Sequence, residues 1–220
     1  MAAVHYQPFS EGVPVKSFPN GVEVRTMKVE DSEFAGRILV EGFESKFIHA
    51  VGKRNLDKVM EASSIDHRSM GSIYHRIFIA TVDGQPAGLM ELKFHGDKSH
   101  GGSSEPYSQR LGCWVMCRLG IMLDSMTESV GQGRCYVDHI AVDARFRGKG
   151  LGKALLETAD EVALRNNCNV IYLWVYDGNR AKHLYERQGY VTVDTGGGCI
   201  VKCLFGMEPF AKMEKNLQNF

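Results

Sequence analysis

The sequence carries no excess of charge, because its 26 basic and 26 acidic residues cancel. A chain without net charge has no overall field that would draw it to nucleic acid or to an anionic membrane, so we expect neither as a partner. No apolar run reaches the roughly 18 residues that a membrane-spanning helix needs. No leader with a charged start and an apolar centre stands at the N-terminus. We therefore expect a cytoplasmic protein.

Metal-binding and disulfide patterns are also missing. The six cysteines form no C-x-x-C pair. Cys113 and Cys117 are four residues apart, as are Cys199 and Cys203, a spacing that a zinc site or simply one shared face would give. Several cysteines lie in segments typical of core strands or helices, so we expect reduced, buried thiols. The histidines show no ligand spacing, and we expect no metal.

Proline is scarce and unevenly placed, since three of the six prolines lie within residues 1–21. We expect this segment to be an extended arm. A composition of 44% hydrophobic and 24% charged residues is ordinary for a folded domain, and 220 residues suit one domain with a substantial core. We place that domain at 22–207, with an insertion at 95–134 and a C-terminal tail at 208–220.

Hydrophobic periodicity predicts the elements. Alternating residues predict a strand at 22–27, and Asp83-Gly84 predicts the tight turn of a hairpin. The apolar segment 111–123 is too short to span a bilayer, and we expect it to pack as a helix over the sheet. The expected strands are 22–27, 77–82, 86–94, 136–142, 170–175, 190–193 and 199–205. The expected helices are 32–43, 53–63, 111–123, 150–166 and 180–188.

Residues 136–176 read as strand, helix and parallel strand. The strand at 170–175 is almost wholly apolar, as expected of a strand covered on both faces. Such a unit is the right-handed crossover of an α/β fold. The sequence therefore predicts an α/β protein.

The strand at 136–142 runs directly into a basic turn with three glycines, at 148, 150 and 152, which opens the next helix. Glycines let the backbone approach a ligand, and the N–H groups of such a turn, together with the positive end of a helix, stabilise a phosphate. The surrounding positive charges are those of Arg145, Arg147, Lys149 and Lys153. The segment therefore has the composition of an anion-binding site.

Two common phosphate motifs do not fit this turn. A P-loop needs G-x-x-x-x-G-K-[ST], but Gly148 and Gly152 are one residue too close and Lys153 is followed by Ala154. A dinucleotide fingerprint needs G-x-G-x-x-G, and Lys153 stands where its third glycine would be.

The segment Arg145 to Gly150 matches R-x-x-G-x-G after an apolar strand, and there it resembles the acetyl-CoA-binding signature of the GNAT N-acetyltransferase superfamily. About thirty residues later, Asn179 to Tyr190 resembles the second signature of that family, N-x-x-A-x-x-L-Y-x-x-x-G-[FY]. The two signatures follow each other in the family's order. The resemblance covers about residues 22–207.

The resemblance implies a central mixed, mostly antiparallel sheet of about seven strands, with a parallel splayed pair in the middle and helices on both faces. It implies acetyl-CoA as co-substrate and direct transfer of its acetyl group to a primary amine. We favour a small or amino-acid-like acceptor. The alternatives are a protein lysine or N-terminus, or an inactive CoA-binding regulatory domain. We expect a monomer or a homodimer.

In the family, the strand before the turn pairs with the pantetheine arm of CoA, which implies main-chain contacts from Ile140 and Val142. Asn179 matches a position that contacts the pantetheine, and it would also suit a helix N-cap. The expected cofactor-binding residues are Ile140, Ala141, Val142, Arg145, Arg147, Gly148, Lys149, Gly150, Leu151, Gly152, Asn179 and Tyr185.

Direct transfer needs a base, because an aliphatic amine has a pKa near 10.4, and an acid for the leaving thiolate. Tyr185 matches the family's general acid, with a plain core tyrosine as the alternative. Asp138 is our candidate base, because a carboxylate on a central strand is costly unless it is paired or functional. The alternatives are a water chain, or an Asp138 that only pairs with a buried arginine. We expect His139 to face the opposite side.

The insertion at 95–134 is longer than usual for the family, and we expect it near the acceptor mouth together with residues 41–74. Trp114 and Arg118 from this insertion, with Tyr136, are the expected substrate contacts. The alternative is an apolar patch that covers the sheet or mediates dimerisation.

Overall fold

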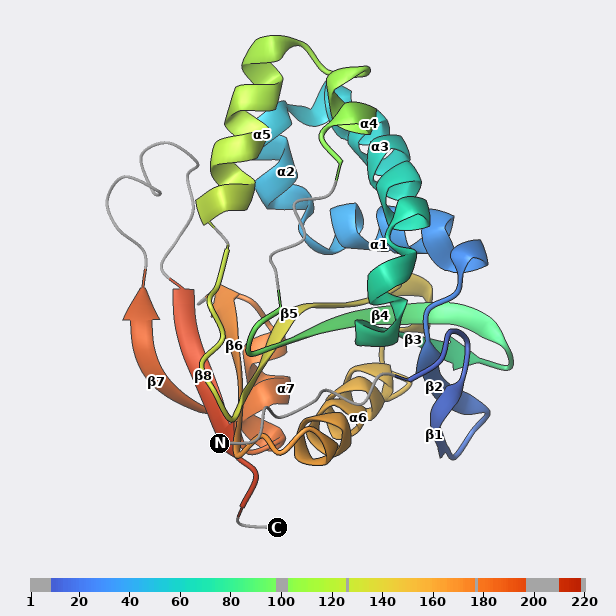
Figure 1. The fold of residues 1–220 in the computed structure, drawn as a ribbon, viewed down its shortest axis with the longest axis vertical. Helices are drawn as coiled ribbons and strands as arrows, with labels where there is room; N and C mark the ends of the chain where they lie inside the picture. The colour runs from blue at the N-terminus through green and yellow to red at the C-terminus, as the bar shows by residue number, and fades with distance from the viewer. Residues whose placement is uncertain (1–8, 98–102, 126, 177, 197–209, 219–220) are drawn as a thin grey trace.

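A computed structural model shows a mixed sheet of eight strands in the order β1-β2-β3-β4-β5-β6-β8-β7, with helices on both faces (Figure 1). It describes residues 9–97, 103–125, 127–176, 178–196 and 210–218. The strands are β1 (Pro14–Phe18), β2 (Val22–Thr26), β3 (Ile77–Val82), β4 (Gln85–Phe94), β5 (Arg134–Val142), β6 (Val170–Tyr176), β7 (Val191–Gly196) and β8 (Phe210–Asn216). The α-helices are α1 (Ser32–Gly42), α2 (Glu44–Val51), α3 (Leu56–Ser69), α4 (Glu105–Ser108), α5 (Cys113–Ser125), α6 (Leu151–Arg165) and α7 (Ala181–Arg187).

The centre of the sheet holds its one parallel pair among the described strands, β5 with β6. These strands pair at three positions, the last of which joins Tyr136 to Tyr172. β5 continues to Val142, so its edge on the β6 side is unpaired over residues 137–142 within the described part of the chain. The predicted α/β fold with a splayed parallel pair in the middle is confirmed.

Two helical layers cover the sheet (Figure 1). α6 packs on one face, where Leu155 and Val162 are fully buried among residues of β2 to β6. These positions repeat at helical spacing, which explains why this stretch forms an amphipathic helix. α1 packs on the other face, with Ile38 buried against Leu89 of β4 and Ala141 of β5. Tertiary packing of these two apolar faces holds the strand, turn and helix unit in place.

α5 does not pack over the sheet, so that expectation is wrong. It lies beside α2, at the far end of the helical layer from β4 (Figure 1). Leu119 and Met122 of α5 are buried with Phe47 and Val51 of α2 in one cluster. α2 was not among the expected elements, and its apolar face gives α5 a partner that the sequence pattern did not reveal.

The sheet extends into both segments that we expected to flank the domain. β1 lies in the expected arm, and β8 lies in the expected C-terminal tail, where it pairs with β6 and β7. Lys215 of β8 forms an ion pair of 2.6 Å with Asp160 of α6, which ties this strand to the helical layer. The strand expected at 199–205 lies outside the described residues. We propose that β1 and β8 both belong to the domain.

The thiols divide into two groups. Cys135 and Cys168 are free and buried, as expected. Cys113 and Cys117 are free but exposed, which corrects the expectation for them, because the buried side of α5 is formed by Leu119 and its neighbours. Cys199 and Cys203 lie outside the described residues.

Among the helices that the structure describes, none has the length and apolar character to cross a membrane.

Candidate active site

The glycine turn between β5 and α6 has the backbone that the sequence predicts. Gly148 and Gly150 have φ values of 80° and 82°, in the left-handed region that favours glycine. The first turn of α6 has no acidic residue. The first N–H groups of a helix lack intrahelical partners, so the start of α6 offers donors and the positive end of a helix dipole to an anion.

Gly152 serves a second purpose in this turn. A Cβ atom at this position would lie 2.8 Å from Cδ2 of Leu184 in α7. The glycine therefore lets α7 pack closely against the start of α6. This contact brings the helix that carries Tyr185 next to the anion-binding turn.

Arg145 pairs with a carboxylate of the turn, although its side chain is 63% exposed. Its Nε and Nη2 atoms donate to Asp143 at 3.1 and 2.8 Å, and Arg37 donates to the same carboxylate at 3.0 Å. These hydrogen bonds, of which that from Arg145 has the largest effect, hold the pKa of Asp143 well below its usual value, whereas burial alone would raise this pKa. The arrangement supports a role for Arg145 in shaping the turn.

Arg147 and Lys149 are the cations of the turn that, unlike Arg145, do not pair with a described carboxylate. Among the described residues, no carboxylate lies within ion-pair distance of either side chain. Lys149 Nζ lies 5.1 Å from the centroid of Phe146, and Arg147 donates to the carbonyl oxygen of Val142 at 3.4 Å. Both are exposed beside the glycine turn, where they add positive charge.

Main-chain groups of β5 face the gap that opens beside β6. Ile140, Ala141 and Val142 pair with β4 on their other side, opposite Met90, Leu89 and Gly88. Since their β6 side has no strand partner among the described residues, this edge can accept another extended chain. It leads directly into the glycine turn.

Tyr185 lies in α7 and is buried, with its ring centroid 6.0 Å from that of Tyr190. Burial raises its pKa to about 12, so the phenol keeps its proton at neutral pH.

Asn179 is exposed, and its Oδ1 accepts the N–H of Ala181 at 2.9 Å, which supports the alternative role as a helix cap. It also stands two residues before Ala181, one fewer than in the family signature.

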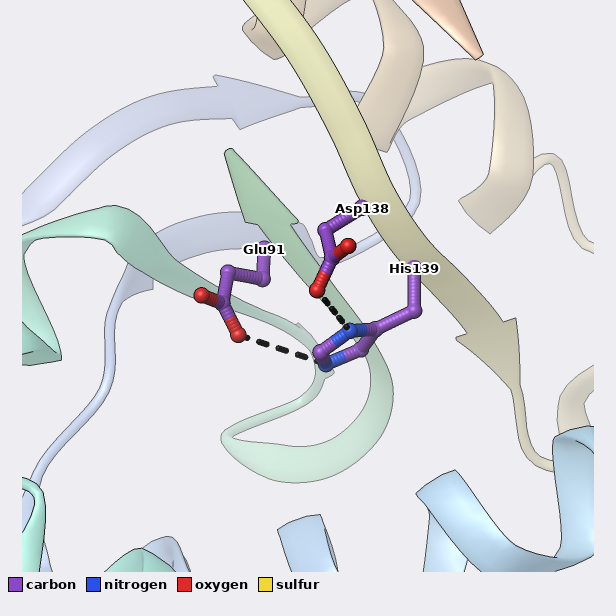
Figure 2. Close-up of side chains that lie close together, drawn as sticks. All are labelled: Glu91, Asp138 and His139. Atoms are coloured by element: carbon purple, nitrogen blue, oxygen red, sulfur yellow. Dashed lines mark hydrogen bonds and ion pairs between the residues drawn. The ribbon is translucent and has the colours of Figure 1, made fainter. Parts of the chain in front are cut away.

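A β-bulge in β5 brings Asp138 and His139 to the same side of the sheet. Glu91 of β4 pairs with His139, whereas the next residue, Leu92, pairs with Val137, which leaves Asp138 as the extra residue. The expectation that His139 faces the opposite side is therefore wrong, because the bulge interrupts the alternation of the strand. Figure 2 shows the imidazole between the carboxylates of Asp138 and Glu91.

The cluster is closely connected. His139 Nδ1 lies 3.2 Å from Asp138 Oδ2, and its Nε2 lies 3.6 Å from Glu91 Oε2 (Figure 2). Lys93 Nζ lies 2.9 Å from the same oxygen of Asp138. His139 Nε2 is buried and has no hydrogen-bond partner. One nitrogen of the imidazole is thus fixed by a carboxylate, and the other lies near Glu91 without forming a hydrogen bond.

Charge and burial act against each other in this cluster. Burial raises the pKa of Asp138, but the hydrogen bond with His139 and the charges of His139 and Lys93 outweigh it and lower the pKa to about 2. Burial lowers the pKa of His139, but Asp138 and Glu91 together raise it above its ordinary value. Burial raises the pKa of Glu91. Asp138 is therefore an ionised partner, and its charge, with that of Glu91, makes the imidazole of His139 more basic than usual.

A cavity of about 560 Å³ lies over this cluster, on the face covered by α1 to α5. Its lining includes both apolar and charged side chains. The charged and titratable residues among them are Lys46, Asp66, His67, Glu91, Lys93, Tyr107, Asp124, Asp138 and His139. Ligand atoms of Glu91, Asp138 and His139 lie within 4.8 Å of one another, but Lys93 already supplies a cation to Asp138.

The three expected substrate contacts do not line this cavity. Trp114 is 75% exposed on α5, and Arg118 donates to the carbonyl oxygen of His49. Tyr136 stacks on Tyr172 with 5.1 Å between ring centroids. The sequence reasoning missed Lys46, Glu91 and Lys93. A carboxylate between the apolar residues Met90 and Leu92 of β4 was the available signal for Glu91.

Comparison with known proteins gives a family and a fold. The model of the acetyltransferase (GNAT) family matches residues 57–190. The spermine/spermidine N(1)-acetyltransferase of Bacillus subtilis is 38% identical over 60 residues, 26% of this chain and 40% of that protein. The thialysine N-epsilon-acetyltransferase of Bos taurus is 36% identical over 75 residues, 33% of this chain and 44% of that protein. The chain thus spans less than half the length of these curated relatives.

Solved structures extend the likeness in fold to most of the chain. The PaiA N-acetyltransferase of Thermoplasma acidophilum, solved with coenzyme A, has a TM-score of 0.57 at 15% identity and covers 89% of this chain and 98% of its own. The putative acetyltransferase YncA of Salmonella typhimurium, solved with acetyl-CoA, has a TM-score of 0.54 at 13% identity and covers 91% and 96%. These structures show that the similarity in fold extends beyond the residues that the family model matches. The family model covers more than half of the sequence, and therefore this chain belongs to the acetyltransferase (GNAT) family.

Proposed function

We propose that this protein transfers the acetyl group of acetyl-CoA directly to a primary amine of a small molecule. The observation that carries the proposal is the continuity of three features along β5. The bulge holds His139 and Asp138, the unpaired edge follows at 140–142, and the glycine turn comes next. A ligand that has a diphosphate, an extended amide-containing arm and a reactive end fits these features in that order.

For the co-substrate, the turn would bind the diphosphate through the N–H groups of residues 148–152. Main-chain groups of Ile140 and Val142 would pair with the amides of the pantetheine arm, as another strand would. Gly148 and Gly150 make this fit possible, since their positive φ values set the path of the turn. The bound coenzyme in two solved relatives of the same fold supports this assignment.

Proton removal from the acceptor falls to His139 in this proposal. An aliphatic ammonium must lose a proton before its nitrogen can attack, and a base with a pKa near neutrality does this most efficiently. Asp138 is ionised and engaged by Lys93, so it serves by fixing the tautomer and orientation of His139, which leaves Nε2 as the acceptor. A bridging water can complete the path from the amine.

Tyr185 would protonate the departing thiolate. In the overall reaction a nitrogen–carbon bond forms, the carbon–sulfur bond of the thioester breaks, and the thiol leaves with a proton. A phenol whose pKa is raised to about 12 by burial stays protonated and can donate at neutral pH. The contact between Gly152 and Leu184 positions its helix beside the cofactor turn.

A small acceptor fits the site better than a protein chain. The cavity is lined by residues of α1 to α5, β4 and β5, and its volume of about 560 Å³ is in the range of small-molecule sites. The relatives act, by their names, on spermine, spermidine and thialysine, which are small amines. A protein lysine or N-terminus remains the second candidate acceptor.

We also propose a cytoplasmic location, because exposed free thiols at Cys113 and Cys117 suit a reducing compartment.

The test combines binding and turnover. Calorimetry with acetyl-CoA should show saturable binding. A thiol-release assay should then show amine-dependent formation of CoA with small amines, and less with a lysine peptide or a peptide with a free N-terminus. Binding without transfer to any amine would indicate a regulatory CoA-binding domain. Absence of binding would reject the proposal as a whole.

A further inference from the structure

The acceptor cavity contains two lysines that differ in their surroundings. Lys93 is paired with Asp138 at 2.9 Å. Lys46, on α2, also lines the cavity, but among the residues that the structure describes no carboxylate oxygen lies within ion-pair distance of its Nζ. The cavity therefore holds one cation that a carboxylate of the protein neutralises, Lys93, and one without such a partner among the described residues, Lys46.

Aromatic rings hold the ammonium of Lys46 in place. Its Nζ lies 4.7 Å from the ring centroid of Phe43 and 4.8 Å from that of Phe210. These rings come from the junction of α1 and α2 and from the start of β8. Cation–π contacts orient the charge and offset part of its desolvation, but they do not replace a counter-ion. Burial lowers the pKa of Lys46 to about 8, which agrees with a desolvated ammonium, while the charge of Asp138 acts in the opposite direction.

A desolvated and unpaired cation in a ligand cavity is costly unless a ligand supplies the opposite charge. We propose that Lys46 binds a carboxylate of the acceptor, so that the acceptor is a small molecule with both an amine and a carboxylate, like an amino acid. This inference rests on the proposed acetyl transfer and adds the chemistry of the acceptor to it. The amine end then faces His139, and the carboxylate end faces Lys46.

The same charge distinguishes this acceptor from a polyamine. A second ammonium group would meet the cation of Lys46 on the wall where the carboxylate is expected. Like charges at close range disfavour such a ligand. The two curated relatives illustrate the alternatives, because one is named for polyamines and the other for an amino acid.

The experiment compares matched acceptors that differ only in the carboxylate. The ω-amino acids from 3-aminopropanoate to 6-aminohexanoate are each compared with the alkylamine of the same chain length, which has a similar basicity. For the ω-amino acid of the best-fitting length, we expect kcat/KM to exceed that of its alkylamine by roughly ten- to hundred-fold, the range of a charge-assisted hydrogen bond. In Lys46→Met this ratio should fall to about one, through a rise in KM for the amino acid, with the alkylamine little affected.

Lys58→Met is the matched control, since Lys58 is exposed on the neighbouring helix α3. This variant should keep the wild-type ratio. A second measurement needs no variant: acetic anhydride labels lysines, and mass spectrometry locates the label. Excess pentanoate should protect Lys46 from labelling, whereas 1-pentanol should not, and Lys58 should be labelled equally in both.

The outcomes separate this inference from the proposed function. Transfer to both kinds of acceptor with equal efficiency, an unchanged ratio in Lys46→Met, or no protection by pentanoate would overturn the role of Lys46 and leave the acetyltransferase proposal intact. A preference for diamines over ω-amino acids would overturn it as well. Failure to acetylate any of these amines would instead contradict the proposed function.

Discussion

His139 Nδ1 lies 3.2 Å from Asp138 Oδ2, although neighbouring residues of a regular strand point to opposite faces. The bulge at Asp138 produces this contact, because Leu92 pairs with Val137 while Glu91 pairs with His139. A change of register by one residue thus assembles a carboxylate and an imidazole at the floor of the acceptor cavity. The predictions below follow from that contact and from the turn beyond it.

Replacing His139 by Gln should lower kcat/KM by about 10²- to 10⁴-fold, the usual contribution of a general base. Glutamine keeps a polar side chain of similar length and cannot accept a proton at neutral pH. Initial rates at saturating acetyl-CoA measure the effect. A loss of less than ten-fold would show that another group removes the proton.

Replacing Asp138 by Asn should shift the pH profile. Burial lowers the pKa of His139, whereas Asp138 and Glu91 raise it. Removing the charge of Asp138 therefore lowers the pKa of His139, and His139 becomes unprotonated at a lower pH than in the wild type. The acidic limb of kcat/KM should move to lower pH. A limb that stays in place, or moves to higher pH, would contradict the assignment of His139 as the titrating base.

Replacing Tyr185 by Phe should lower kcat by about 10²- to 10⁴-fold if its phenol protonates the thiolate. The ring remains, so the packing against Tyr190 and the melting temperature should change little. Because the pKa of Tyr185 is about 12, the wild type should show no loss of activity from this group below pH 10. Unchanged kcat in the variant would assign Tyr185 to the core.

Replacing Gly150 by Ala should weaken binding of CoA by roughly ten-fold and destabilise the fold by about 1 kcal/mol, since a side chain at a φ of 82° is strained and the turn would rearrange. Calorimetry and urea unfolding measure the two effects. Gly112→Ala is the control, because a Cβ there meets open space and its φ is not positive. Equal affinities for CoA in the two variants would argue against the turn as the diphosphate site.

Replacing Asn179 by Asp should leave the affinity for CoA within about two-fold. The carboxylate still accepts the N–H of Ala181, so the cap of α7 is kept, whereas the side-chain amide donor is lost. Calorimetry of CoA binding decides between the two roles. A loss of ten-fold or more would show that the amide contacts the cofactor as the family resemblance implies.

The cofactor side of the site could be predicted from the sequence, because its signals are local. Glycines at 148 and 150, the apolar strand before them and the periodic helix after them all lie within one continuous segment, and the structure forms β5, the turn and α6 there. The acceptor side could not. The orientation of His139 depends on how β4 pairs with β5, and that register is not encoded within β5 alone.

The remaining differences share this long-range origin. β8 pairs with β6 although about thirty residues separate them along the chain, and its alternation was not recognised as a strand. α5 packs on α2 because both have apolar faces, which periodicity alone does not assign to a partner. The charge of Lys46 became informative only once the structure placed it in the cavity.

The central claim is acetyl transfer to a small amine through His139. The most direct measurement is single-turnover transfer from isotopically labelled acetyl-CoA to a panel of ω-amino acids and alkylamines, followed by mass spectrometry of both products. We predict one labelled N-acetyl product for each CoA released, with transfer lost in His139→Gln while affinity for CoA is retained. Release of CoA without a labelled amine, or no turnover with any amine despite tight binding of acetyl-CoA, would contradict the account.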